Sequence, residues 1–211
     1  MNVTNEDTIK AYDGDVKAYY NLSPQKVSSH VKSWLDEALR DFPKTASLFE
    51  VGSGTGKDAN YIESLGYKIT MSDASMAFVE FLKKNNKSAW HFNVIKDEFD
   101  DKYDLIIADA VLLHFTESEL MKVLNKLNAA LKKSGRLAFT VKRGDGDFTE
   151  KEKLGNVRYF HLWQPDDLKI MLNAAGFVVT YEEIAEDTRG EFKPAWILMV
   201  AENRGIVRQF K

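Results

Sequence analysis

The segment from Leu48 to Gly56 concentrates the residues best suited to contact a ligand. It reads Leu-Phe-Glu-Val-Gly-Ser-Gly-Thr-Gly, with an acid, Glu50, two positions before the first of three alternating glycines. Glycines that follow a strand let the backbone turn sharply and approach a ligand closely. The segment therefore predicts a ligand-binding loop of the nucleotide-binding type, and the spacing of its residues distinguishes three possibilities.

Two nucleotide-binding fingerprints fail on this spacing. A P-loop requires G-x-x-x-x-G-K-[ST]. Gly56 and Lys57 supply the last glycine and the lysine, but Val51 stands at the first glycine position and Asp58 at the position that holds magnesium. The dinucleotide fingerprint G-x-G-x-x-G would place Lys57 at its third glycine and has no place for Glu50. Both patterns are therefore disfavoured.

The remaining pattern is acid-x-G-x-G-x-G, and it resembles the first motif of the class I S-adenosylmethionine-dependent methyltransferases. Its members here are Glu50, Gly52, Gly54 and Gly56, with Ser53 inside the loop. The resemblance implies that this loop and its acid hold the methionine part of S-adenosylmethionine. A carboxylate suits the ammonium and sulfonium of that cofactor, whereas it would repel a pyrophosphate.

A second acid supports the same cofactor. Asp73 ends the next apolar run, 21 positions after Gly52. An acid at about this distance accepts hydrogen bonds from ribose hydroxyls. The run Asp73-Ala74-Ser75-Met76 resembles the second motif of the family, which implies that Ala74 and Met76 flank the adenine. Taken alone, Asp73 could be a helix cap, but in register with the glycine loop it favours ribose binding.

Two further segments resemble later motifs of the family. Asn93 and Val94 follow the third apolar run, where the family often has an acid that meets the adenine amino group. The Asn93 amide oxygen can accept that hydrogen bond, and the Val94 backbone N–H can donate to the ring. Asp109 and Ala110 follow the fourth run, and the resemblance implies that they lie beside the sulfonium and the methyl group.

His114 is the candidate general base. It follows the fourth apolar run, and an open parallel sheet binds its ligands beyond the carboxyl ends of its strands. A base is needed only where the nucleophile carries a proton whose pKa exceeds the working pH. The alternative for His114 is a partly exposed residue ahead of a helix cap.

Residues for the acceptor side come from two regions. Tyr12 and Tyr19 fall on N-terminal helices that could close over the cofactor, with ordinary helix packing as the alternative. The second region combines a possible anion-binding arginine after the fifth apolar run with an aromatic stretch over 158–163, where a substrate wall and strand packing are equally supported. Its candidates are Arg143, Tyr159, His161 and Trp163.

Composition excludes several classes of protein. The chain has 211 residues, is 44% hydrophobic and 29% charged, and carries a net charge of −3. These values suit a folded domain with a full core and disfavour a dedicated duplex-binding domain, which is usually strongly basic. Without cysteine, and with four histidines outside any metal-binding motif, neither a disulfide nor a metal site is expected. No apolar run approaches the ~20 residues of a membrane span, and no secretory signal is evident, so we expect a cytoplasmic protein.

Helical and strand patterns alternate along the chain. We expect helices over 5–20 (broken near Gly14), from Ser23-Pro24 to Phe42, over 57–65 and 75–84, from a capping box at Thr116 and Glu119 to Gly135, and over 165–175. Strands are expected over 46–51, 67–72, 88–92, 103–108, 137–141, 177–181 and 196–200, with 143–157 irregular. This order predicts an α/β fold with three layers and a seven-stranded, mostly parallel sheet whose last strand is antiparallel.

Together these features predict one Rossmann-like domain over 1–211, with an N-terminal helical lid over 1–44 at the cofactor edge and a core sheet over 45–202. The resemblance, which covers 45–200 and includes a small bacterial branch of unassigned substrate, implies methyl transfer to a small molecule by a monomer or homodimer. The alternatives are a cofactor-binding sensor or assembly factor without turnover, an RNA or protein methyltransferase, and a nicotinamide-dependent reductase.

Overall fold

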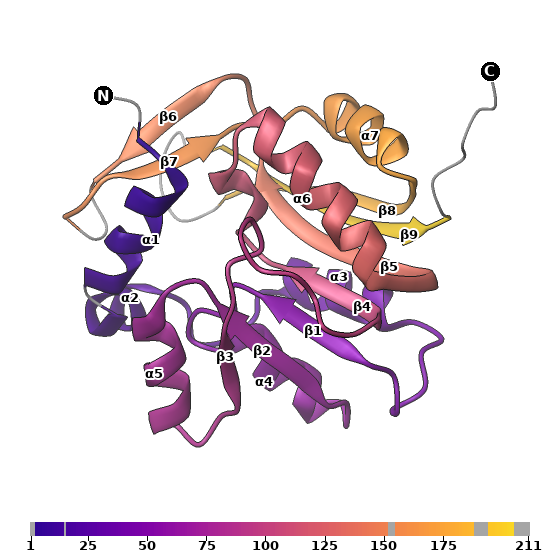
Figure 1. The fold of residues 1–211 in the computed structure, drawn as a ribbon, viewed down its shortest axis with the longest axis horizontal. Coiled ribbons are helices and arrows are strands. Elements are labelled where there is room, and N and C mark those ends of the chain that lie inside the picture. Colours follow the sequence, from indigo (N-terminus) through magenta and orange to yellow (C-terminus); the bar gives the residue numbers. More distant parts are fainter. Residues whose placement is uncertain (1–2, 15, 152–154, 188–193, 205–211) are drawn as a thin grey trace.

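The computed structural model describes residues 3–14, 16–151, 155–187 and 194–204, and a seven-stranded sheet forms its centre (Figure 1). Its strands, in spatial order, are β3 (Ala89–His91), β2 (Ile69–Asp73), β1 (Leu48–Val51), β4 (Tyr103–Ala108), β5 (Leu131–Lys142), β9 (Trp196–Asn203) and β8 (Phe177–Ala185). The first five run parallel, whereas β9 is antiparallel to both of its neighbours. The expected sheet is therefore confirmed, including its antiparallel last strand.

Helices cover both faces of the sheet. One face carries α3 (Ser29–Leu39), α4 (Lys57–Ser64) and α5 (Met76–Lys84), and the other carries α6 (Glu117–Ala130) and α7 (Pro165–Ala174). The apolar side of α6 shows why, because its residues at helical spacing are all buried: Leu120, Val123, Leu124 and Leu127. Among the helices that the structure describes, none is both long and apolar enough to cross a membrane.

Two N-terminal helices and a β-hairpin lie at the carboxyl-end edge of the sheet. The helices are α1 (Asn5–Gly14) and α2 (Val16–Leu22), and the hairpin joins β6 (Asp147–Glu150) to β7 (Arg158–His161). In Figure 1, α1 lies between α5 and the hairpin, and it contacts both. The expected break near Gly14 separates α1 from α2.

The expectation that a helix begins at Ser23-Pro24 was wrong. Helix α3 begins at Ser29, and its N-cap is Ser28, whose hydroxyl accepts a hydrogen bond from the Val31 N–H at 3.3 Å. Pro24 instead follows the end of α2, a common place for a residue that cannot continue a helix.

Helix α6 begins as expected but ends earlier. Its capping box is confirmed, with the Thr116 and Glu119 side chains each bonded to the other's backbone N–H. The helix stops at Ala130, and β5 follows at once, so Gly135 does not end a helix. A Cβ on Gly135 would lie 2.9 Å from the Lys132 carbonyl oxygen and 3.0 Å from that of Tyr103, so glycine permits the close approach of β5 to β4.

Strand β6 lies inside the stretch that was expected to be irregular. It has four residues, mostly polar and only partly buried, so its strand signal is weak. Its pairing with β7 brings the Phe148 ring parallel to that of Phe160, with centroids 4.9 Å apart. This stack explains the hairpin, which propensity alone does not reveal.

Trp34 offers a test of how α3 is attached to the sheet. Its ring is fully buried, and its Nε1–H donates to the Met199 carbonyl of β9 at 2.9 Å. We expect Trp34→Phe to lower the free energy of unfolding by about 1–3 kcal/mol, because it removes this hydrogen bond and leaves a small cavity. The matched control is Trp90→Phe on β3, where the side chain is 64% exposed. Urea denaturation that shows equal losses for both variants would contradict this expectation.

Candidate functional site

The predicted ligand loops meet at one edge of the sheet. Strand order reverses between β1 and β4, and in open α/β sheets ligands bind beyond the strand carboxyl ends at such a point. The glycine loop follows β1, Asp73 ends β2, and Asp109 follows β4. The Gly54 N–H donates to Asp73 Oδ2 at 2.8 Å, so the structure brings the first two predicted motifs into direct contact.

Gly52 and Gly54 are required for different reasons. Both have left-handed backbone, with φ of 71° and 52°. A Cβ on Gly52 would lie 2.4 Å from the Val111 Cγ2 atom, so this glycine allows the segment that follows β4 to pack against the loop. A Cβ on Gly54 would meet nothing within 4 Å. The backbone of Gly54 therefore faces open space that a ligand can fill.

Asp73 is buried and partly satisfied by backbone donors. Its Oδ2 accepts from Gly54 and its Oδ1 from the Ser75 N–H, both at 2.8 Å. Burial raises the pKa of Asp73 to about 6, despite these two hydrogen bonds. Each oxygen keeps further acceptor capacity, which suits ligand hydroxyls. Next to it, Asp13 of α1 accepts from the Ser75 hydroxyl at 2.6 Å and from the Ala77 N–H at 3.1 Å, which ties α1 to the start of α5.

A buried carboxyl oxygen at this edge, Glu50 Oε2, has no hydrogen-bond partner among the described residues, and Glu50 is only 1% exposed. Asp58, in the first turn of α4, is also buried, but its Oδ1 forms an ion pair with Lys57. Burial raises the pKa of Glu50 to about 7, although the Ser53 hydroxyl acts in the opposite direction. Burial and the nearby Asp109 carboxylate raise the pKa of Asp58 well above its ordinary value. The buried Glu50 oxygen without a donor suggests a ligand with a cationic group.

A lysine and a threonine hold the Asp109 carboxylate in place. Lys57 Nζ lies 3.1 Å from Asp109 Oδ2 and 3.4 Å from Asp58 Oδ1. The Thr140 hydroxyl donates to Asp109 Oδ1 at 2.5 Å and accepts from the Ala110 N–H at 2.9 Å. Burial opposes ionisation of Asp109, but Lys57 and Thr140 keep its pKa below the ordinary value.

This arrangement has a conformational cost at Ala110. Its φ of 56° is left-handed, which costs a residue with a Cβ roughly 1–2 kcal/mol. The bond from its N–H to Thr140 helps to hold that conformation. Sequence reasoning did not identify Lys57, Asp58 or Thr140 as site residues. The signal for the first two was their position directly after the glycine loop, whereas Thr140 lies on β5 outside any motif.

His114 is buried within a chain of polar contacts. Its Nδ1 lies 2.6 Å from the Tyr159 carbonyl oxygen, which can only accept, so Nδ1 carries the proton and donates. Its Nε2 therefore accepts from the Tyr12 hydroxyl at 3.0 Å. The Tyr12 oxygen in turn accepts from Arg158 Nη1 at 3.1 Å. Burial lowers the pKa of His114 to about 4, and the Arg158 charge adds to this effect. His114 is thus neutral at pH 7, and Tyr12 separates it from any ligand on that side.

Tyr12 also belongs to an aromatic cluster over the edge. Its ring packs against Tyr19 and Phe78 of α5, with centroids 5.6 and 6.0 Å away. Burial raises the pKa of both Tyr12 and Tyr19. The nearby Asp73 carboxylate adds to this effect at Tyr12, and the Asp109 carboxylate adds to it at Tyr19. The aromatic cluster therefore lies close to two of the predicted cofactor acids.

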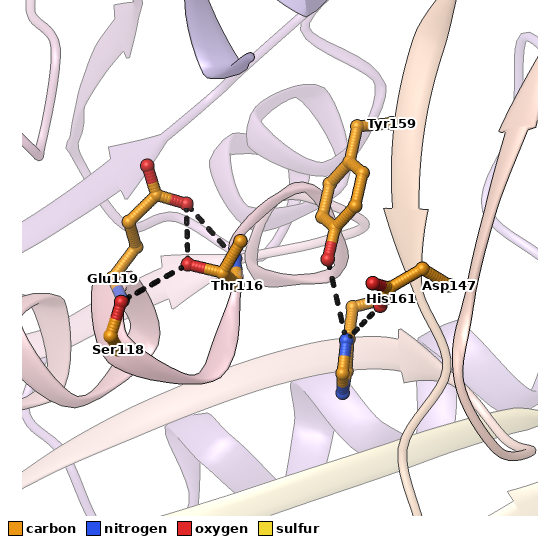
Figure 2. A network of polar contacts seen from close by, with 6 residues as sticks. All are labelled: Thr116, Ser118, Glu119, Asp147, Tyr159 and His161. Atoms are coloured by element: carbon orange, nitrogen blue, oxygen red, sulfur yellow. Dashed lines mark hydrogen bonds and ion pairs between the residues drawn. The ribbon is translucent and has the colours of Figure 1, made fainter. Parts of the chain in front are cut away.

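Polar side chains on the outer face of the hairpin form a separate group (Figure 2). The Tyr159 hydroxyl lies 3.4 Å from His161 Nδ1, which also pairs with Asp147. Their neighbours in sequence, Arg158 and Phe160, are buried on the inner face, and the Phe160 ring lies 4.7 Å from the His114 ring. Alternate residues of β7 thus point to opposite sides, and only the inner ones contact Tyr12 or His114 through their side chains.

The last two acceptor-side candidates lie beyond this hairpin. Trp163 is buried in the core, its ring 4.2 Å from that of His161, and Arg143 is exposed. The two pair through a backbone bridge between the end of β5 and the segment before α7. Among the described residues, no hydrogen bond, ion pair or ring contact joins either to the glycine loop.

Asn93 and Val94 follow β3 at the same edge and are both buried. The Asn93 amide oxygen accepts from the Ile95 N–H at 3.0 Å, which leaves it one lone pair for a ligand. Their adenine-binding role stays a prediction. Within the described ranges, no three His, Asp or Glu side chains are grouped in a way that could hold a metal ion.

Comparisons with known proteins agree with this architecture. The model of a family described as a methyltransferase domain matches residues 25–182. A comparison with curated protein sequences found no match. Among solved structures, the chain resembles the 1,6-didemethyltoxoflavin-N1-methyltransferase of Burkholderia thailandensis, with a TM-score of 0.71, 16% identity, and coverage of 95% of this chain and 87% of that one.

Two further structures share the fold. The magnesium protoporphyrin IX methyltransferase of Synechocystis PCC 6803 has a TM-score of 0.71 and 14% identity, over 96% of this chain and 100% of that one. The N-methyltransferase NodS of Bradyrhizobium japonicum WM9 has a TM-score of 0.69 and 14% identity, over 94% and 100%. At these identities the likeness concerns the fold alone.

The protonation of His114 can be measured directly. We expect the imidazole ¹⁵N signals to show one neutral tautomer, protonated at Nδ1, and a pKa of about 4. Tyr12→Phe should shift the Nε2 signal toward that of an unbonded nitrogen, whereas Tyr67→Phe, which removes a hydroxyl bonded to the Phe42 carbonyl, should leave it unchanged. A pKa near 6.5, the unperturbed value, would show that the network does not form in solution.

Proposed function

Because the chain belongs to the methyltransferase domain family, we propose that it transfers the methyl group of S-adenosylmethionine to a small molecule. The observation that carries this proposal is the unpaired, buried Glu50 oxygen beside the open space at Gly54. A buried acceptor that lacks a donor is costly unless a ligand supplies one. A ligand with a cationic group therefore fits the site better than a neutral or anionic one.

The residues present fit this cofactor along its length. Glu50 would hold the ammonium, the loop from Gly52 to Gly56 would surround the methionine part, and Asp73 would accept from the ribose hydroxyls. Ala74, Met76, Asn93 and Val94 would contact the adenine, and Asp109 and Ala110 would lie nearest the sulfonium. When bound, S-adenosylmethionine supplies a methyl group already activated by a positively charged sulfur.

The same charges disfavour NAD and ATP. Four acids, Glu50, Asp58, Asp73 and Asp109, face this edge, and Lys57 is the cation paired with two of them. A pyrophosphate would add negative charge to a site that already has an excess of it, in surroundings where burial strengthens electrostatic repulsion. This balance favours a cofactor with a net positive charge.

The protein's own contribution is alignment and exclusion of water. Helix α1 is tied down by Asp13 at α5 and by Thr8, whose hydroxyl accepts from the Tyr159 N–H at 3.1 Å. We propose that residues 1–44 act as a lid and that His114 handles the acceptor's proton through Tyr12. Alignment of nucleophile and methyl group in a dry site is the main requirement of such a displacement.

The net charge of the chain and the enzymes that share its fold support a small-molecule acceptor. Solved structures of the same fold include enzymes named for small substrates, and a chain with a net charge of −3 has no general attraction for nucleic acid. A cofactor sensor without turnover is the alternative, and incubation with labelled cofactor and a pool of metabolites distinguishes the two. A cytoplasmic location, no metal requirement, and a monomeric or homodimeric state are parts of the same proposal.

Cofactor binding should release a proton from Glu50. The pKa of this carboxyl is about 7 in the free protein, and a bound cation would lower it, so affinity should rise as the pH increases from 5.5 to 7.5. Calorimetry at pH 6 in two buffers of different ionisation enthalpy measures the release. Glu50→Gln should reduce it and weaken binding roughly ten- to a hundredfold. Glu80→Gln, on the exposed side of α5, is the control, and proton release that Glu50→Gln leaves unchanged would refute the assignment.

Gly54 should be required for binding rather than for folding. Gly54→Ala and Gly146→Ala both place a Cβ on left-handed backbone with nothing within 4 Å, so their strain is comparable. We expect similar small losses of thermal stability, but loss of S-adenosylmethionine binding for Gly54→Ala only. Equal affinities in calorimetry would mean that the ligand does not approach this glycine.

A further inference from the structure

The structure contains a cavity that the proposed function does not use. Its volume is about 380 Å³, and it lies between the loop after β5, the end of β7, and the first turns of α6 and α7. Small-molecule sites typically measure roughly 300–1,000 Å³. The described residues that line it include neither Tyr12 nor His114 and none of the glycine loop. The cavity is therefore distinct from the site proposed for the cofactor and its acceptor.

Three carboxylates from different parts of the chain line this cavity. Glu117 is in the first turn of α6, Asp145 is in the loop after β5, and Asp167 is in the first turn of α7. Acids in a first turn also suit the positive end of a helix dipole, so their presence alone does not define a ligand. No Lys or Arg is among the described residues that line the cavity, so its wall carries a net negative charge.

His161 adds a hydrogen-bond acceptor whose orientation is fixed. Its Nδ1 pairs with the Asp147 carboxylate and lies 3.4 Å from the Tyr159 hydroxyl, on the edge of the ring that Figure 2 shows facing both. Because a carboxylate can only accept, Nδ1 carries the proton, and Nε2 is the acceptor of the neutral ring. His161 lines the cavity, and its Nε2 has no hydrogen-bond partner among the described residues.

Trp163 gives a second, independent indication of a ligand. It is 2% exposed and lines the same cavity, with its ring centroid 4.2 Å from that of His161. Its Nε1–H is buried and has no acceptor among the described residues. A buried donor without an acceptor is costly, because it has lost its hydrogen bond to water. A ligand oxygen that accepts from this N–H would remove that cost.

We propose that this cavity binds a small amino alcohol, a molecule with an ammonium group and a hydroxyl oxygen on neighbouring carbons. The ammonium donates to His161 Nε2 and faces the three carboxylates, while the hydroxyl oxygen accepts from Trp163 Nε1. The two groups lie close together in the ligand because the two rings are adjacent in the protein. Apolar side chains complete the wall and suit an apolar substituent: Leu162, Ile170 and Met171.

Ligands that carry only one of the two groups fit this cavity less well. A diol supplies the oxygen but no cation for the acidic wall. A simple amine supplies the cation but leaves the Trp163 N–H without an acceptor. A metal ion is disfavoured, since the described residues contain no group of three His, Asp or Glu side chains that could hold one.

The experiment uses three probes that share a phenyl ring and a two-carbon chain. 2-Amino-1-phenylethanol carries both groups, 1-phenylethane-1,2-diol lacks the ammonium, and 2-phenylethylamine lacks the hydroxyl. We expect calorimetry on the full-length protein at pH 8 to show at least about tenfold tighter binding of the first probe than of either other. Equal affinity for all three probes, or no binding of the first, would overturn the inference.

Asp167→Asn and Asp166→Asn form a matched pair of variants. Both acids lie in the first turn of α7, so each change removes a similar interaction with the helix dipole. Asp167 lines the cavity, whereas Asp166 contacts Lys169 and does not line it. We expect Asp167→Asn to weaken binding of 2-amino-1-phenylethanol about two- to fivefold and Asp166→Asn to leave it unchanged. Equal weakening by both variants would overturn the assignment to this cavity.

The indole N–H signals test the Trp163 contact in the wild-type protein. The chain has four tryptophans, so Phe substitutions at the other three assign the Trp163 signal by elimination. This signal should move to lower field on saturation with 2-amino-1-phenylethanol, while that of the exposed Trp90 stays in place. An unshifted Trp163 signal at saturation would overturn the inference. None of these measurements requires cofactor or methyl transfer, so their outcome is independent of the proposed function.

Discussion

Removal of water from the carboxylates at the end of β1 and β4 is the constraint on which the rest of this molecule depends. Glu50 is only 1% exposed, because it lies on a short buried strand and is followed by the glycine loop. A carboxylate in such surroundings loses hydration that its protein neighbours do not fully replace. The glycine loop, the ion pair of Lys57 with Asp109, and the strained backbone at Ala110 all serve to keep these acids close together and open to a ligand.

Helix α1 is part of the same constraint. Helix α1 bonds to α5 through Asp13 and to β7 through Thr8, so it spans the edge at which the acids end. Its aromatic residue, Tyr12, packs against Tyr19 and Phe78, and the order of donors from Arg158 through Tyr12 to His114 fixes the orientation of the Tyr12 hydroxyl. One lone pair of the Tyr12 oxygen is left to accept a hydrogen bond from a ligand. Helix α1 therefore links the segment around Asp73 to the hydrogen-bond network around His114.

Sequence reasoning recovered the sheet and the positions of the first two motifs because these follow from local patterns. Glu50, Gly54 and Asp73 lie at strand ends, where apolar periodicity stops, so their meeting at one edge could be predicted from the order of strands alone. Contacts between distant segments could not be predicted in this way. The bond of Thr140 to Asp109, and that of Tyr12 to His114 across 102 positions, depend on tertiary packing that leaves no local signal.

The alternation of side chains along β7 has a consequence for how this protein can change in evolution. Arg158 and Phe160 serve the interior, while Tyr159 and His161 face outward, and a shift of one residue would exchange the two sets. An insertion inside the strand would therefore displace Arg158 or Phe160 from the interior, whereas substitution of an outward residue leaves both in place. Relatives should therefore differ more in the outward residues than in the inward pair. The contacts of the inner side chains with Tyr12 and His114 can then be kept while the outer side of the same strand changes.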